Sequence, residues 1–276
     1  MTQSDFKTEP DGMLIGTWKT PVNIAAHAEG SIHNDETAKQ LGLEGGWIAG
    51  SIHLEQFAPL LLERFGLYWL NAGTMSAHFR NATLSGQPVR AMLGTADPGT
   101  RFAGVRMEDE AGRVVCEGVA FTGEPGAVTP IRKRLAANHA ATPGPLLSDV
   151  EIGRKVENIP SMIPESRLAQ DLPGITAPIA AYASGALPAN LSIDALRAVE
   201  PHLVALPSGC VGLYGSIELQ MLNGPIEAGI DYTCNGEVLC VGQTPRTETL
   251  WYSSELLREG RPVARLLMMS RIMQLD

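Results

Sequence analysis

The stretch that decides the fold is SIHLEQFAPLLLERFG, residues 51–66. Its apolar side chains recur at alternating spacings of three and one: Leu54, Phe57, Ala58, Leu61, Leu62 and Phe65. This spacing predicts one continuous apolar stripe on an α-helix, wide enough to be wrapped by a sheet. Ser51 is expected to cap the start and Gly66 to end the helix in a left-handed conformation. Pro59 removes a backbone hydrogen bond and predicts a bend.

Four β-rich runs follow this helix, separated by glycine, proline or acidic turns. They are residues 75–79, 88–93, 102–108 and 114–121. The sequence DEAG before Arg113 is typical of a tight antiparallel connection. A helix followed by several antiparallel strands indicates an α+β arrangement.

The second part of the chain has the same order of elements. SIDALRAVEPHL, residues 192–203, predicts a helix with its own internal proline, Pro201. Five strand-like runs follow: IELQML, IDYTC, EVLCVGQ, TETLWYSS and VARLLMMSRIM. The chain therefore resembles two copies of one helix-then-strands unit.

Glycines at matching places support this duplication. The matches, with offsets of 137, 142, 143 and 148 residues, are Ile15-Gly16 with Ile152-Gly153, Gly73 with Gly215, Gly86 with Gly229, and Gly112 with Gly260. The offsets increase slowly, as they would for two copies with small insertions. We therefore expect a first half at residues 1–122, a linker at 123–147 and a second half at 148–276.

The linker is rich in proline, glycine, alanine and threonine and contains one basic cluster, Arg132-Lys133-Arg134. A charge run of this kind is usually a solvated face, and contact with a phosphate-bearing substrate is the alternative.

Composition limits the classes of function. Of 276 residues, 44% are hydrophobic and 18% are charged, and the net charge is −9 without a long basic tract. These values favour a core-forming protein and give no indication of nucleic acid or an anionic membrane as partner. The four cysteines lack zinc-type spacing, so we expect reduced thiols and no metal. The N-terminus lacks the layout of a secretory signal, and we expect a cytoplasmic protein.

One polar stretch, GSIHNDETAKQLG at residues 30–42, has two interpretations. His33 with the following Asn34, Asp35 and Glu36 is a candidate active site. The same residues also fit a short helical turn that Asp35 caps and Gly42 ends.

The region IHNDETAKQLGLEGGWIAGS resembles the signature of the MaoC-like hydratases and dehydratases. His33 takes the place of the motif histidine, and Gly50 that of the glycine before the central helix. Asp35, Ala38 and Gly42 follow in the family's order. The resemblance covers most of residues 14–122 and, more faintly, 150–274. It implies a double hotdog fold, in which each half wraps an antiparallel sheet around a long helix.

The chain departs from the family pattern where the catalytic aspartate is expected. Ala28 occupies that position, and Gly30-Ser31 replaces an Asn-Pro pair. Glu29, four residues before His33, or Asp35, on its other side, is then the candidate for the missing carboxylate.

The resemblance implies addition or removal of water at an α,β-unsaturated acyl thioester or a similar activated carbonyl. His33 would be the acid/base, Gly50 and Ser51 the backbone donors for the developing oxyanion, and His53 a neighbour in the same cavity. No cofactor is implied, coenzyme A being part of the substrate where it carries the acyl group. Similar proteins also suggest a homodimer. A hotdog thioesterase and a non-catalytic binding protein remain the alternatives.

The segment before the second helix, AAYASGALPANLS, has neither histidine nor acid. We therefore expect the first half to carry the site and the second half to close it.

Overall fold

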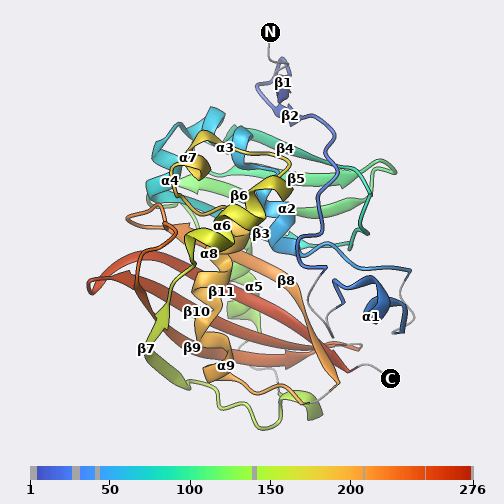
Figure 1. Cartoon of the computed structure of the whole chain (residues 1–276), viewed down its shortest axis with the longest axis vertical. Helices are drawn as coiled ribbons and strands as arrows, with labels where there is room; N and C mark the ends of the chain where they lie inside the picture. The colour runs from blue at the N-terminus through green and yellow to red at the C-terminus, as the bar shows by residue number, and fades with distance from the viewer. Residues whose placement is uncertain are drawn as a thin grey trace.

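The computed structural model describes residues 5–26, 32–40, 44–138, 142–207, 209–245 and 247–274. The named strands in these ranges form one antiparallel sheet of eleven strands, in the order β1-β2-β4-β5-β6-β3-β8-β11-β10-β9-β7 (Figure 1). Apart from β1, the order is two sets of five strands arranged symmetrically about the β3–β8 pair. The two halves of the chain therefore share one sheet by joining edge to edge.

The strands of the first half are β1 (Phe6–Thr8), β2 (Leu14–Gly16), β3 (Gly73–Phe79), β4 (Val89–Ala96), β5 (Ala103–Asp109) and β6 (Val114–Thr122). Those of the second half are β7 (Lys155–Ser161), β8 (Cys210–Met221), β9 (Tyr232–Gln243), β10 (Glu248–Arg258) and β11 (Arg261–Gln274). All the strand runs expected from the sequence lie in strands, but IDYTC and EVLCVGQ, expected as two runs, form the single strand β9.

The first central helix is bent, as Pro59 predicts. It consists of α2 (Gly50–Glu55) and α3 (Ala58–Phe65). Gly66 follows with φ of 65°, a conformation that glycine adopts at little cost. The expectation that Ser51 caps the helix is wrong, because α2 begins one residue earlier and its N-cap Ala49 has no side-chain oxygen to offer.

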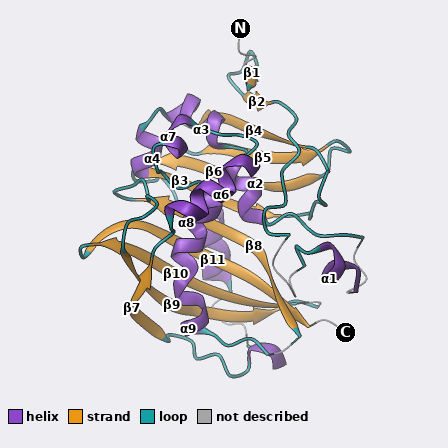
Figure 2. Cartoon of the chain, viewed as in Figure 1, coloured by secondary structure: helices purple, strands orange, loops and turns teal. Residues whose placement is uncertain are grey.

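The second central helix starts with α8 (Ala189–Leu196), tightens to a 3-10 turn, η3 (Arg197–Val199), and ends with α9 (Glu200–Leu203). The change of geometry comes just before Pro201, whose ring is incompatible with an unbroken α-helix. Figure 2 shows both central helices on the inner face of the curved sheet. Smaller helical segments complete the described chain: α1 (Asp35–Gln40), α4 (Tyr68–Ala72), α5 (Pro130–Ala137), η1 (Pro145–Leu147), α6 (Glu165–Asp171), η2 (Leu172–Gly174) and α7 (Ala180–Ala183).

A single large core lies between the central helices and the sheet and continues across both halves. Its fully buried side chains include Phe57 and Leu60 from the first helix and Leu191 and Leu196 from the second. Full burial of one such side chain contributes about 1.5–3 kcal/mol. The apolar stripes read from the sequence are therefore what holds the helices against the sheet.

Two of the four glycine matches lie at equivalent turns of the two halves, whereas Gly73 begins β3 and Gly215 lies within β8. Gly112 and Gly260, in the β5–β6 and β10–β11 turns, have φ of 75° and 74°, and Gly86 and Gly229, before β4 and β9, have φ of 87° and 72°. A side chain at such angles is strained, so glycine serves the same purpose in each copy. The Ile-Gly pairs are not equivalent, because the first glycine ends β2 whereas the second precedes β7.

The expected linker contains a helix, α5, which packs on the outer face of the sheet near the β3–β8 junction. Arg132 donates from Nε to Glu218 over 2.7 Å, and Nη1 of Arg134 lies 2.8 Å from Nδ1 of His78. Two of the three basic residues are thus engaged with the sheet. Within the described part of the chain, no helix has the length and apolar character needed to cross a membrane.

Candidate active site

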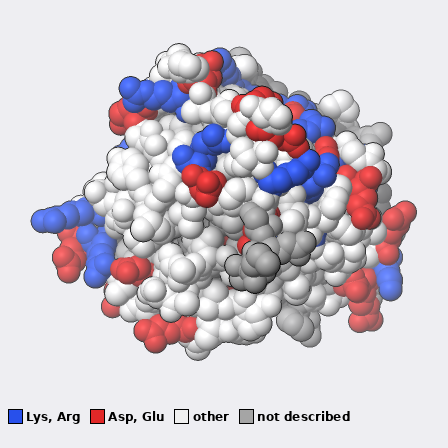
Figure 3. All heavy atoms as spheres, turned by 90° about the horizontal axis from the view of Figure 1, so that it is seen from above, with Lys and Arg blue, Asp and Glu red and all other residues white. Residues whose placement is uncertain are grey.

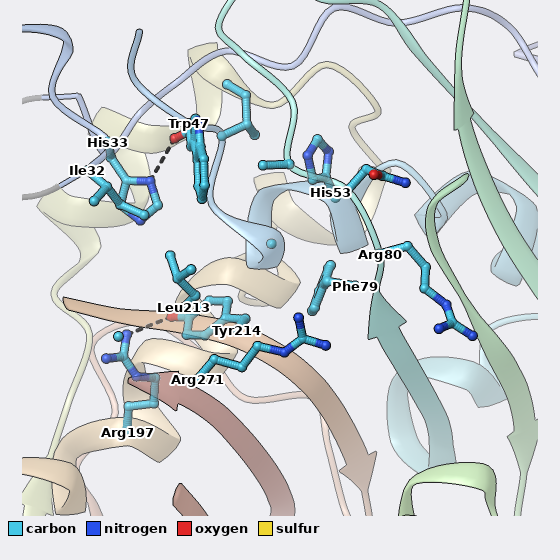
Figure 4. A pocket seen from close by; sticks show the side chains of 15 residues that line it. Ile32, His33, Trp47, His53, Phe79, Arg80, Arg197, Leu213, Tyr214 and Arg271 are labelled. Carbon is cyan, nitrogen blue, oxygen red and sulfur yellow. Dashed lines mark hydrogen bonds between the residues drawn. The ribbon is translucent and has the colours of Figure 1, made fainter. Parts of the chain in front are cut away.

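A cavity of about 430 Å³ opens where the two halves meet. β8 pairs with β3 only from Ser216 to Gln220, so the earlier residues of β8 extend past the end of β3 at Phe79. The cavity occupies the resulting gap between the halves (Figure 4). Its lining residues are Ile32, His33, Trp47, Ile48, Gly50, His53, Phe79, Arg80, Asn81 and Ala82 from the first half, and Arg197, Gly212, Leu213, Tyr214 and Arg271 from the second.

His33 is held in the cavity wall by bonds to the backbone. Its ring Nδ1 lies 2.7 Å from the carbonyl oxygen of Trp47, and its own carbonyl accepts from Nδ2 of Asn23 over 2.8 Å. A carbonyl oxygen only accepts, so Nδ1 carries the proton in this bond. In the neutral imidazole, Nε2 then carries the lone pair that a base requires.

Burial lowers the pKa of His33 below its usual value. The bond to Trp47 acts in the opposite direction, and the positive charge of Arg197 lowers the pKa further. The ring is therefore mainly neutral near pH 7.

Asp35 lies outside the cavity lining and is exposed. Its Oδ1 accepts a 2.7 Å hydrogen bond from the N–H of Gly46. A Cβ atom at Gly46 would be 2.4 Å from the carbonyl oxygen of His33, so this loop packs tightly on the backbone of His33. Asp35 thus positions the loop that supports the histidine.

The sequence suggested that Asp35 caps α1, but the cap is Asn34. Oδ1 of Asn34 accepts from the N–H groups of both Glu36 and Thr37 over 3.0 Å. Glu29, the other candidate carboxylate, lies outside the described residues.

Gly50, Ser51 and His53 all lie at the start of α2 but differ in exposure to the cavity. Gly50 and His53 line it, whereas the buried Ser51 does not. Gly50 is packed beneath Phe79, whose ring a Cβ atom would approach to 2.8 Å. Nε2 of His53 is hydrogen-bonded to Oγ1 of Thr83 over 2.8 Å, and burial lowers the pKa of His53 to about 4. His53 is therefore a neutral, buried neighbour of the cavity.

The second half supplies an arginine–tyrosine pair. Arg197 donates to the hydroxyl of Tyr214 and to Oε2 of Glu200, each over 2.6 Å. Burial raises the pKa of Tyr214 to about 12, so its hydroxyl stays protonated. These bonds fix the guanidinium of Arg197 near His33.

Three of the lining residues were not predicted as site residues: Arg197, Tyr214 and Arg271. All three are more than 160 residues away from His33 in the sequence. The strand run VARLLMMSRIM contains two arginines, Arg265 and Arg271, so the sequence alone does not distinguish the one that lines the cavity. The described residues include no cluster of three or more His, Cys, Asp or Glu side chains arranged to hold a metal ion.

Two long helices, each wrapped by antiparallel strands, with the two sheets joined edge to edge, define a double hotdog fold. Solved structures with this architecture match nearly the whole chain. A protein assigned as a MaoC domain dehydratase from Chloroflexus aurantiacus J-10-fl superposes with a TM-score of 0.59 at 16% identity, covering 99% of this chain and 97% of the other.

Two further structures are similar. A conserved hypothetical protein from Mycobacterium tuberculosis, with a double hotdog fold, has a TM-score of 0.58 at 14% identity and coverage of 93% and 94%. A dehydratase domain of the Curacin polyketide synthase has a TM-score of 0.55 at 12% identity and coverage of 98% and 96%.

Neither models of protein families nor curated protein sequences give a match. At such identities the structural likeness establishes the fold, and the predicted double hotdog fold is confirmed.

Proposed function

We propose that the protein is a hydratase or dehydratase that adds or removes water at an α,β-unsaturated acyl thioester or a similar activated carbonyl. The observation that carries the proposal is the bond between Nδ1 of His33 and the Trp47 carbonyl, which leaves a basic Nε2 on a ring in the cavity wall. The dehydratases among the similar structures support the same reaction class.

In hydration, Nε2 of His33 takes a proton from water while the hydroxyl oxygen bonds to the β-carbon. The electron pair of the double bond moves toward the carbonyl, and the α-carbon then takes up a proton. The imidazolium formed in the first step supplies that proton, so one histidine serves as base and then as acid. Dehydration is the reverse sequence.

The electrostatics around His33 favour this cycle. Burial and Arg197 both disfavour the imidazolium, so the ring is available as a base at neutral pH and returns its proton readily. No Asp or Glu is among the described residues that line the cavity. A mechanism that relies on His33 alone is therefore compatible with this part of the site.

The developing enolate needs hydrogen-bond donors. N–H groups in the first turn of a helix lack partners within the helix, and the N-cap of α2 provides no side-chain oxygen to occupy them. The N–H of Gly50 is the donor we propose, since Gly50 lines the cavity. Coenzyme A, where it carries the acyl group, would be part of the substrate.

A His33→Ala variant tests the proposal against a panel of enoyl thioesters, with loss of the conjugated double bond followed by absorbance. Turnover should fall about 10²- to 10⁴-fold, the usual contribution of general acid–base catalysis, while urea unfolding stays close to that of the wild type. A His202→Ala variant is the matched control, because His202 is exposed on α9 in the second half. Equal turnover in the two variants would contradict the role of His33.

The lack of a carboxylate among the described lining residues favours one second candidate, a non-catalytic acyl-binding protein. That protein would bind thioesters without consuming them. A thioesterase would instead release a free thiol, which a thiol reagent detects, so the same panel separates all three functions.

A further inference from the structure

The cavity is unusually cationic for a protein with a net charge of −9. Three arginines, Arg80, Arg197 and Arg271, line it together with His33 and His53, and the described lining residues include no acid. On the face shown in Figure 3, by contrast, acidic and basic side chains lie interspersed. Unlike this face, the described lining of the cavity has basic side chains without acidic ones.

The three arginines differ in how their charge is satisfied. Arg197 is bonded to Glu200 and Tyr214. Arg80 forms an ion pair with Glu117 and points away from His33. The guanidinium of Arg271 forms no hydrogen bond or ion pair with any residue that the structure describes, and its side chain extends from β11 toward Phe79 (Figure 4).

Arg271 belongs to a group of like charges. Besides burial, the positive charges of Arg80 and Arg271 lower the pKa of Arg134, so both lie within electrostatic range of Arg134. In this group, Glu117 is the carboxylate that pairs with Arg80. Bringing cations together without compensating anions is unfavourable, so a ligand that supplies negative charge would be stabilised here.

We propose that the cavity binds a ligand that carries an oxyanion separate from its reactive carbonyl, and that Arg271 anchors this oxyanion. A guanidinium is suited to the task, because its planar donors match the two oxygens of a carboxylate or phosphate. This proposal rests on the proposed function, because it takes the ligand to be a thioester. A cavity of about 430 Å³ is within the range of small-molecule sites.

The oxyanion has two possible sources on a thioester. It belongs either to the acyl group, as a terminal carboxylate, or to the carrier, as a phosphate of coenzyme A. Both present the same chemistry to Arg271, and a set of four ligands separates them.

The probes are thioethers, which neither hydrate nor hydrolyse, so binding is measured whether or not the proposed reaction occurs. S-butyl and S-(3-carboxypropyl) groups differ in a methyl or a carboxylate at the end, and each is placed on coenzyme A and on the phosphate-free N-acetylcysteamine. Calorimetry compares the wild type with Arg271→Gln and Arg271→Lys. Arg265→Gln is the matched control, since Arg265 lies on the same strand, is half exposed and pairs with Glu255.

If the oxyanion is the acyl carboxylate, Arg271→Gln should bind both carboxypropyl probes about 10- to 100-fold more weakly than the wild type and bind the butyl probes equally well. A carrier phosphate predicts the same loss for both coenzyme A probes and none for the N-acetylcysteamine pair. Arg271→Lys should lose less than Arg271→Gln, since it keeps the charge. Equal affinities of wild type and Arg271→Gln for all four probes would overturn the proposal, as would equal losses in Arg265→Gln. Neither outcome depends on whether His33→Ala remains active.

Discussion

The two central helices begin in opposite surroundings. The start of α2, at Gly50, borders the cavity of about 430 Å³. The start of α8, at Ala189, borders a space of only about 70 Å³. There, Glu55 accepts a 3.0 Å bond from the N–H of Asn190 and a 2.9 Å bond from the hydroxyl of Tyr182.

This difference shows how a duplicated fold retains one candidate site. Each copy creates a helix start with unpaired N–H groups facing the partner half. In the second copy a buried carboxylate occupies these groups, so they are unavailable to a ligand. In the first copy the N-cap has no side-chain bond, and the cavity remains open. Glu55 belongs to α2, so a residue from the central helix of the first half occupies the helix start of the second half.

The largest expected effect comes from Glu55, whose buried carboxyl should make the free energy of unfolding depend on pH. Burial raises the pKa of Glu55 from 4.5 to about 7. The folded state thus favours the protonated carboxyl. Its contribution to the free energy of unfolding is complete below pH 4.5 and is lost as the pH rises through 7. The loss is about 3 kcal/mol. Glu55→Gln keeps an acceptor for Asn190 and removes the charge, so its unfolding free energy in urea should not show this decline.

His53 contributes to the same titration with the opposite sign. Its pKa is lowered from 6.5 to about 4, so stability is complete above pH 6.5 and is lost as the pH falls toward 4. The contributions of Glu55 and His53 therefore act in opposite directions between pH 4.5 and 6.5 and offset each other in the wild type, whereas the stability of Glu55→Gln should rise with pH over this range. A variant whose stability still declined between pH 4.5 and 7 would show that another group is responsible.

A methyl group added at Gly50, in the open start of α2, should have an intermediate effect on stability. In Gly50→Ala the new methyl group would lie 2.8 Å from the ring of Phe79, and overpacking of this kind costs about 1–3 kcal/mol. Phe79→Leu removes the ring edge and should restore part of the stability in the double variant. Urea unfolding of both single variants and the double measures the coupling. Simple additivity would mean that Phe79 does not limit the residue at position 50.

The smallest effect is expected at Asp35. Asp35→Ala removes the bond to Gly46 and should cost about 0.5–1.5 kcal/mol, with turnover reduced about tenfold through misplacement of His33. Asp35→Asn keeps an oxygen acceptor and should behave like the wild type. An Asp35→Asn variant as inactive as His33→Ala would instead identify Asp35 as a proton-transfer group.

Much of the fold was predictable because it depends on local patterns. The stripe from Leu54 to Phe65 and Pro59 predict the bent helix, and the glycine pairs predict the duplication. The error at Ser51 has a local cause, since one residue of difference in the helix start moves the cap to Ala49. Within the candidate site, His33 and Gly50 were predicted through a motif, and the structure places both in the cavity wall.

The sequence by itself thus determined the two central helices, most of the strands and three residues of one cavity wall, His33, Gly50 and His53, because periodicity, turn chemistry and a short motif act over a few residues. Only the tertiary structure decided what lies opposite His33. Arg197, Tyr214 and Arg271 reach the cavity because β8 continues past the end of β3, a matter of strand register between segments far apart in the chain. No local pattern encodes that register, since it arises from the packing of two whole halves against each other.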